Sequence, residues 1–156
     1  MLRASSLALL LAFASAPALA QPVSPVPEIA HEQAAQQILD RTDWKQAEVI
    51  DVELGDHHYT PATMEFRLHQ PYVLRLKNVG GHAHDLKGQA FYRAIVAKMV
   101  LGRNGRVVTP FIQSVYVRPK AELELWFVPV AEGDYEFFCT IDGHREEGME
   151  GRIVIR

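Results

Sequence analysis

From residue 47 to the C-terminus, the chain consists of short runs of apolar and β-branched residues separated by turn residues. In one such run, Leu123, Leu125 and Phe127 share one face, and Glu122 and Glu124 lie on the other. Many short strands with regular turn signals indicate a β-sandwich or a β-barrel. The predicted strands cover residues 49–54, 63–68, 72–77, 112–117, 122–127, 135–139 and 152–155.

The segment Gly133-Asp134-Tyr135 favours the sandwich over the barrel. A tyrosine that enters a strand shortly after a glycine-containing corner is typical of the tyrosine corner of Greek-key sandwiches. We therefore predict an all-β fold, a Greek-key β-sandwich.

Two segments have helical rather than strand periodicity. Ala30, Ala34, Ala35, Ile38 and Leu39 predict a short N-terminal helix over residues 30–41, packed on the outside of the domain. Apolar side chains at helical spacing also predict a short helix over residues 89–100, inserted between strands. These side chains are Phe91, Ala94, Ile95 and Met99, and we interpret Met99 as a core residue.

The first 20 residues have the features of a cleavable signal peptide. Arg3 supplies the positive start, residues 7–13 are apolar, and Ala18-Leu19-Ala20 forms a small-x-small cleavage site. The apolar run is too short to span a bilayer, and no later one is long enough. We expect export to the periplasm, with residues 21–46 forming a Pro-rich linker and the short helix, and residues 47–156 forming one domain.

The balance of charge argues against one class of partner. The chain has 16 Lys and Arg against 19 Asp and Glu, a formal net charge of −3. Mild acidity helps solubility. It gives no support to nucleic-acid binding, which favours a basic face.

The only cysteine of the chain begins a segment rich in metal donors. Cys139, His144 and Met149 lie within eleven residues, each separated from the next by four residues. A type 1 copper site uses two histidines, one cysteine and a weak axial methionine, because soft sulfur and imidazole together select copper. An unpaired cysteine is unusual in a small exported domain, and coordination by a metal explains it. The segment therefore predicts a copper site that needs one further histidine.

Two histidines compete for that position. His82 and His84 follow the predicted strand of residues 72–77, after Gly80 and Gly81. Both share one face if the segment stays extended, so alternation alone does not choose between them. We interpret His57 and His58 as solvated surface residues in a turn.

These motifs make the chain resemble an exported cupredoxin, a small blue-copper protein, with a ligand loop similar to those of rusticyanin, auracyanin and the plastocyanin–azurin group. The resemblance covers residues 47–156 and is carried by Asn78 to His84-Asp85 and by Cys139-x-x-x-Gly143-His144-x-x-x-Gly148-Met149. It places the first histidine six residues after the asparagine, and so implies His84. The implied ligands of one copper are His84, Cys139 and His144, with Met149 axial.

The resemblance also implies supporting roles and a function. Asp85 and Thr140 are at positions where cupredoxins tie the two ligand loops together. His144 is expected to offer its ring edge to a partner such as a c-type cytochrome or an oxidase. Two departures affect this docking surface: Asp142 replaces a common proline, and residues 145–147 replace small apolar residues with Arg-Glu-Glu.

The expected function is that of a monomeric one-electron carrier rather than an enzyme. Multicopper oxidases and nitrite reductases place a histidine beside the copper cysteine, whereas Phe138 and Thr140 flank Cys139 here. The alternative is a copper-binding protein for copper delivery, storage or resistance. Further potential donors favour that alternative, namely His57, His58, His82 and Met99.

Overall fold

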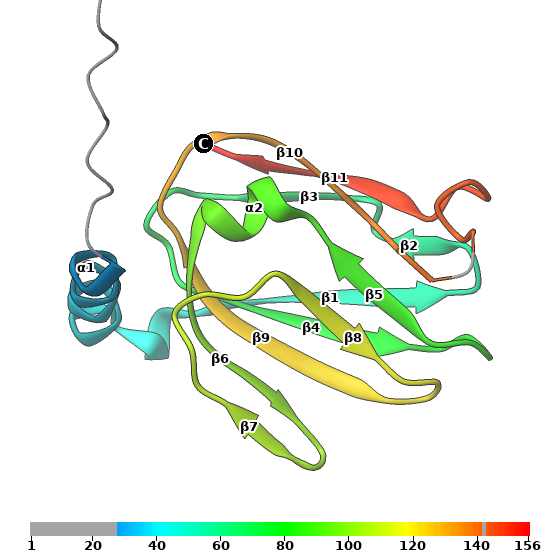
Figure 1. Cartoon of the computed structure of the whole chain (residues 1–156), viewed down its shortest axis with the longest axis horizontal. Coiled ribbons are helices and arrows are strands. Elements are labelled where there is room, and N and C mark those ends of the chain that lie inside the picture. Colours follow the sequence, from blue (N-terminus) through cyan, green and yellow to red (C-terminus); the bar gives the residue numbers. More distant parts are fainter. Residues whose placement is uncertain (1–27, 142) are drawn as a thin grey trace, which may run out of the picture.

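Alternating apolar residues fold into two facing sheets in the computed structural model, which describes residues 28–141 and 143–156 (Figure 1). One sheet has the order β2 (His58–Thr60), β1 (Glu48–Gly55), β4 (Tyr72–Asn78), β9 (Glu122–Pro129), β6 (Ile95–Gly102) and β7 (Gly105–Val107). The other has the order β3 (Thr63–Phe66), β11 (Glu150–Ile155), β10 (Gly133–Phe138), β5 (His84–Lys87) and β8 (Ser114–Val117). The predicted β-sandwich is confirmed. The predicted signal peptide lies outside the described residues.

The core lies between the inner faces of the two sheets. Leu74 and Leu125 come from the first sheet and Phe137, Ile153 and Ile155 from the second, and all five are fully buried. Burying one large apolar side chain contributes about 1.5–3 kcal/mol relative to leaving it exposed. Burial of the apolar side chains on the inner faces is therefore what holds the two sheets together.

Strand pairing brings three connections to one end of the sandwich. β1 pairs parallel with β4, and β3 pairs parallel with β11, while the other pairs are antiparallel. As a result the β1–β2 turn, the β4–β5 connection and the β10–β11 loop meet at the end opposite the N-terminal helix (Figure 1).

The N-terminal helix, α1 (Glu28–Arg41), begins two residues before the predicted range. A 3-10 turn, η1 (Trp44–Gln46), follows it and leads into β1. The Lys98 ammonium lies over the rings of Trp44 and Trp126, 4.4 and 5.3 Å from their centroids, and so ties this segment to β6 and β9.

The prediction of a helix over residues 89–100 is wrong for most of its length. Only α2 (Gln89–Arg93) is helical, and Ile95–Gly102 forms β6 against β9. The pairing register shifts between Ala97 and Met99. This irregularity breaks the strict alternation of a strand, so apolar residues fall at a spacing that imitates a helix. Met99 is half-buried.

The tyrosine corner is confirmed. The Tyr135 hydroxyl donates to the backbone carbonyls of Ala131 and Glu132, at 3.1 and 2.9 Å. Its hydrogen bonds fix the corner at which the chain enters β10, the strand that leads to Cys139.

Three strands of three or four residues were not predicted, namely β2, β5 and β7. In the described part of the chain, helices are too short or too polar to cross a membrane.

Gly151 is expected to be indispensable for packing in β11. A Cβ atom there would lie 2.4 Å from the backbone oxygen of Ala62 and 2.3 Å from Cζ of Phe137. Because the backbone cannot move aside cheaply, Gly151→Ala should lower the free energy of unfolding by roughly 1–3 kcal/mol. Chemical denaturation measures this. Gly81→Ala is the control, since its nearest atom would be 3.9 Å away; equal stabilities of the two variants would contradict the packing argument.

Candidate metal centre

Cys139 directly follows β10 and opens a loop that folds back on itself. The Cys139 amide donates to the Met149 carbonyl at 3.0 Å, and the Met149 amide donates to the His144 carbonyl at 2.9 Å. The His144 amide donates to the Ile141 carbonyl, also at 2.9 Å. These bonds hold the three sulfur- and nitrogen-bearing residues of the segment at one end of the sandwich. Asp142, within this loop, is outside the described residues.

The fold brings His84 to this loop from 55 residues earlier in the sequence than Cys139. His84 is the first residue of β5, which pairs with β8 and β10. Its Nδ1 lies 4.0 Å from Sγ of Cys139, and Nδ1 of His144 lies 3.6 Å from the same sulfur. All three side chains are buried, with exposed fractions of 0%, 1% and 6% for His84, Cys139 and His144.

This spacing fits one shared metal ion. When a nitrogen and a sulfur bind the same ion, their bonds to it are about 2.0 and 2.3 Å long. At near-tetrahedral or trigonal angles these bonds place the nitrogen about 3.6 Å from the sulfur. The three donor atoms form a compact group, with every pair within 4.8 Å. Met149 is fully buried beside them and is hydrogen-bonded through its backbone to both Cys139 and His144.

His82, the other candidate from the sequence, lies outside this group. Its side chain is 68% exposed, and its Nδ1 lies 3.4 Å from Oδ1 of Asp56. The structure thus brings His84 rather than His82 to Cys139.

Burial favours the neutral forms of the Cys139 thiol and the His84 imidazole. Desolvation raises the pKa of the Cys139 thiol above its usual value. Desolvation, and then the proximity of His144, lowers the pKa of His84. The neutral imidazole is the form that binds a metal, whereas the thiol releases its proton on binding.

Asp85 and Thr140 join the two donor-bearing segments. The Asp85 carboxylate accepts hydrogen bonds from the amide and the hydroxyl of Thr140, both at 2.7 Å. The hydroxyl of Tyr59 donates to the Asp85 carbonyl. His84 precedes Asp85 and Cys139 precedes Thr140, so these hydrogen bonds fix the position of His84 relative to Cys139.

Asn78 shapes the approach to His84. Its side-chain nitrogen, Nδ2, donates to the backbone carbonyls of His82 and Val117, at 2.8 and 3.1 Å. Its side-chain oxygen accepts from the backbone amide of Gly80 at 2.9 Å. The asparagine is almost fully buried. It satisfies backbone groups that the turn would otherwise leave unpaired.

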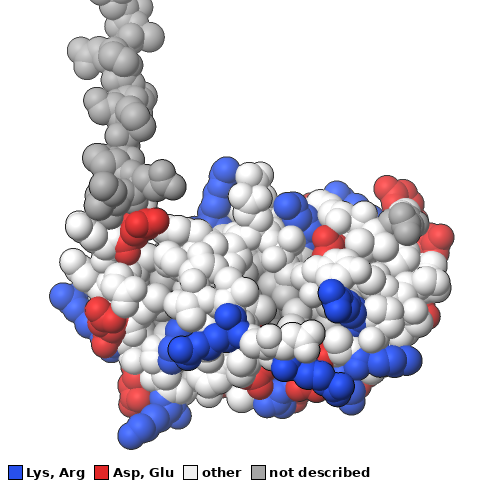
Figure 2. Space-filling model, turned by 60° about the horizontal axis from the view of Figure 1, so that its bottom comes forward, with Lys and Arg blue, Asp and Glu red and all other residues white. Residues whose placement is uncertain are grey.

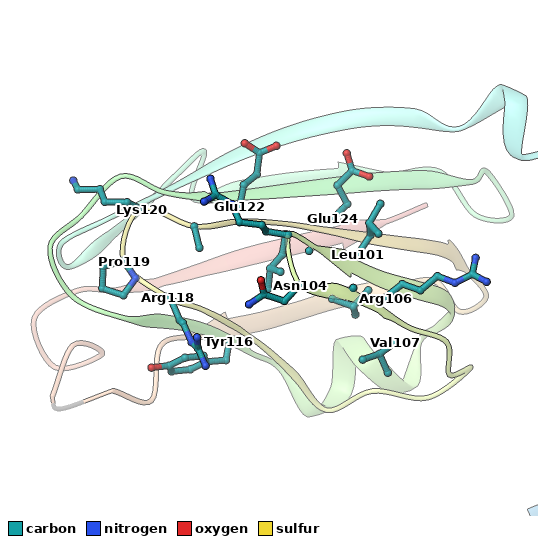
Figure 3. A pocket seen from close by; sticks show the side chains of 16 residues that line it. Leu101, Asn104, Arg106, Val107, Tyr116, Arg118, Pro119, Lys120, Glu122 and Glu124 are labelled. Atoms are coloured by element: carbon teal, nitrogen blue, oxygen red, sulfur yellow. The ribbon is translucent and has the colours of Figure 1, made fainter.

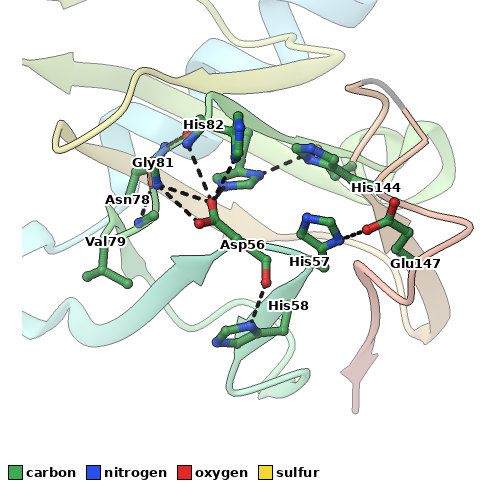
Figure 4. Close-up of polar contacts among 12 residues, drawn as sticks. Asp56, His57, His58, Asn78, Val79, Gly81, His82, His144 and Glu147 are labelled. Atoms are coloured by element: carbon green, nitrogen blue, oxygen red, sulfur yellow. Dashed lines mark hydrogen bonds and ion pairs between the residues drawn. The ribbon is translucent and has the colours of Figure 1, made fainter.

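The expectation that His144 exposes its ring edge is not met. The ring of His57 stacks on that of His144, with centroids 5.0 Å apart and planes at 26°, and His82 lies edge-on at 6.0 Å (Figure 4). His57 also pairs with the Glu147 carboxylate. His57 is therefore part of the cover of the centre. Its side chain is still 36% exposed, so the interpretation of it as a solvated turn residue holds only in part. His58 is exposed, as predicted.

Asp56, next to His57, is a second residue that the sequence analysis missed. Its carboxylate accepts hydrogen bonds from the Gly81 amide. These bonds, together with those from His82, lower the pKa of Asp56 to about 2, although desolvation acts in the opposite direction. Neither residue has a local motif. The turn of β1 and β2 reaches this site only because β1 pairs with β4.

Hollows lie on the surface of the described part of the chain, and two of them are relevant to the site. One, of about 630 Å³, is next to His144 and is lined by His57, His82, Ala83, Tyr116, Thr140, Ile141, His144 and Glu147. A larger one, of about 1280 Å³, lies between the β6–β7 hairpin and the residues around the β8–β9 connection, and the two share Tyr116 (Figure 3). The larger hollow is lined by both basic and acidic side chains, and it contains none of the three clustered donors.

Charges of both signs are interspersed on the face seen in Figure 2. Mixed charges partly cancel at a distance, so this face steers a charged partner only weakly. Near the metal centre, Arg145 is paired with Glu136 and Glu150 and lies over the ring of Phe138.

No protein-family model and no curated protein sequence matches this chain. Solved structures share its fold. Dithionite-reduced auracyanin from Roseiflexus castenholzii aligns over 70% of this chain and 98% of its own, with 17% identity and a TM-score of 0.50. Auracyanin B aligns over 74% of this chain and 93% of its own, with 13% identity and a TM-score of 0.51. McoA multicopper oxidase from Aquifex aeolicus gives a TM-score of 0.59 at 14% identity, over 74% of this chain but 30% of the oxidase.

At these identities the likeness shows the fold, that of the cupredoxins. Within that fold, His84, Cys139 and His144 form a buried cluster typical of a type 1 copper site. Thiolate and imidazole donors suit copper. The fold and the cluster together support a single type 1 copper.

The hydrogen bonds between Asp85 and Thr140 should contribute substantially to stability. Asp85→Ala removes the acceptor of both bonds and should lower the free energy of unfolding of the metal-free protein by roughly 2–4 kcal/mol. Thr140→Val removes only the hydrogen bond from the Thr140 hydroxyl, and should lower the free energy of unfolding by about half as much. Denaturation curves of the two variants test this, and an Asp85→Ala variant as stable as the parent protein would contradict it.

Proposed function

We propose that this chain is an exported type 1 copper protein that carries one electron at a time between redox partners. In this proposal His84, Cys139 and His144 are the equatorial ligands, and Met149 is the weak axial ligand. The observation that carries it is the orientation of the cluster. Nδ1 of both histidines faces the same buried sulfur, at 4.0 and 3.6 Å, in a cupredoxin fold.

The surroundings of the cluster suit electron transfer. A type 1 copper supplies one-electron chemistry when bound, and such transfer is fast when the ligands move little between oxidation states. Here His84 and Cys139 are tied through Asp85 and Thr140, and all three clustered donors are packed into the end of the core. These contacts limit the motion of the ligands themselves.

We favour a carrier over an enzyme, although the solved structures that share this fold include multicopper oxidases and copper nitrite reductases. Phe138 and Thr140 flank Cys139, so no histidine adjacent to the cysteine leads to a second metal centre.

We further propose that the protein acts in the periplasm as a monomer and docks through the end that bears His57 and His144. Its partner is a redox protein such as a c-type cytochrome or an oxidase. The hollow beside His144 and the exposed Glu146 support this. Because Arg145 is already paired with Glu136 and Glu150, and Glu147 with His57, the exposed acidic side chain of Glu146 fits a partner with a basic patch.

Copper delivery, storage or resistance is the second candidate. The observation in its favour is that His57 and His82 lie beside His144, at ring distances of 5.0 and 6.0 Å. Additional imidazoles next to a copper ligand provide donors to which a metal ion can be handed over.

The copper assignment predicts a specific optical signature. Protein loaded with Cu(II) should show an intense thiolate-to-copper charge-transfer band in the red part of the visible spectrum. Cys139→Ser and His84→Gly should abolish this band, whereas His82→Gly should keep it, since His82 lies outside the cluster. Absorption spectra of the four proteins decide the matter. A blue His84→Gly variant, or a colourless His82→Gly variant, would show that the ligand assignment is wrong.

Electron exchange with purified c-type cytochromes, followed by stopped flow, tests the carrier function. Rates with a true partner should fall as ionic strength rises, because the screening length shrinks to about 10 Å at 0.1 M salt. Glu146→Gln should weaken this salt dependence, and Asp40→Asn, on α1 at the opposite end, should not. Salt-independent rates would argue against charged docking. Slow exchange with every redox partner, together with rapid transfer of Cu(I) to an acceptor, would establish the delivery function.

A further inference from the structure

The turn between β1 and β2 places a carboxylate against the β4–β5 connection. Asp56 accepts hydrogen bonds from the Gly81 amide, at 3.1 Å to Oδ1 and 3.3 Å to Oδ2, and from the His82 amide at 3.4 Å (Figure 4). Oδ1 of Asp56 also lies 3.4 Å from Nε2 of His84.

That ring nitrogen has no other partner in the described part of the chain. Nε2 of His84 is buried and makes no hydrogen bond of ordinary geometry, although Asp56 is within ion-pair distance. The other nitrogen, Nδ1, faces Cys139. An unpaired buried ring nitrogen costs free energy, and the Asp56 carboxylate is the acceptor already positioned to remove that cost.

Gly80 makes this approach possible. A Cβ at position 80 would lie 2.4 Å from Oδ1 of Asp56 and 3.1 Å from Nε2 of His84. The glycine therefore leaves open the space in which carboxylate and imidazole meet.

Resting on the proposed copper site, we infer that Asp56 is a positioning residue of the metal centre, whose carboxylate accepts the Nε2 proton of His84. A proton held on Nε2 leaves the lone pair of Nδ1 free to face Cys139. Partners of this kind fix the tautomer and the ring orientation of a metal-binding histidine. The negative charge also stabilises the more positive, oxidised state of the centre and lowers its reduction potential.

A competing explanation is that Asp56 serves His82 and the loop alone. Nδ1 of His82 lies 3.4 Å from the same oxygen. His82→Gln isolates this possibility, because it removes the imidazole and leaves Asp56 and His84 in place.

The test compares Asp56→Ala, which removes the acceptor, with Asp56→Asn, which keeps an acceptor oxygen and removes the charge. The controls are His82→Gln and Asp40→Asn, the latter making the same change of charge on α1. Three quantities are measured: the tautomer of His84 in metal-free protein by ¹⁵N NMR, the affinity for Cu(I) by competition with a chelator, and the reduction potential of the copper-loaded protein.

In the parent protein His84 should carry its proton on Nε2. Asp56→Ala should populate the other tautomer and weaken Cu(I) binding by roughly 10–100-fold. Asp56→Asn should keep most of the affinity and shift the reduction potential upward, and the two controls should match the parent protein. If Asp56→Ala does not fold, Asp56→Asn still tests the upward shift.

Unchanged potentials in a folded Asp56→Asn variant would overturn the inference. So would an equal effect of His82→Gln, or an Nδ1-protonated His84 in the parent protein. The NMR measurement needs no copper. A His84 tautomer that depends on Asp56 in a protein that forms no blue site would support the positioning role and refute the proposed function.

Discussion

Polar side chains can be buried in an apolar interior only if each finds a partner, and this requirement shapes one end of the sandwich. Asn78, His84 and Asp85 lie in or beside β4 and β5 and are nearly inaccessible to solvent. Their partners come from three other segments: the Cys139–Met149 loop, β8, and the turn of residues 55–58. The donor cluster is thus supported by the same contacts that satisfy the backbone around it.

The parts of the centre that are close in sequence could be predicted, and the parts that depend on strand pairing could not. Cys139, His144 and Met149 lie in one short segment, so their donor types were recognisable directly. His84 followed from its spacing to Asn78 only through a family resemblance. Nothing local distinguishes Asp56 or His57 from ordinary turn residues, because their positions depend on parallel pairing between β1 and β4.

The fold shows the same division between local and long-range information. Strands such as β4 and β9 are runs of seven and eight residues with recognisable apolar character, and their ends were predicted within one or two residues. β6 was mistaken for a helix because the irregularity near Lys98 changes which side chains face the core. Ile95, Val96 and Val100 are β-branched, which favours a strand, but periodicity outweighed that weaker signal.

The position of α1 has a practical consequence. The helix lies at the far end of the sandwich from the donor cluster (Figure 1), and its outward residues are exposed. A protein attached to an electrode or a bead through a residue of α1, such as Gln33 or Gln37, would present the end bearing His57 and His144 to the solution. Its orientation on the support would then be built in by the fold, and current measured at such a surface would report transfer through that end of the molecule.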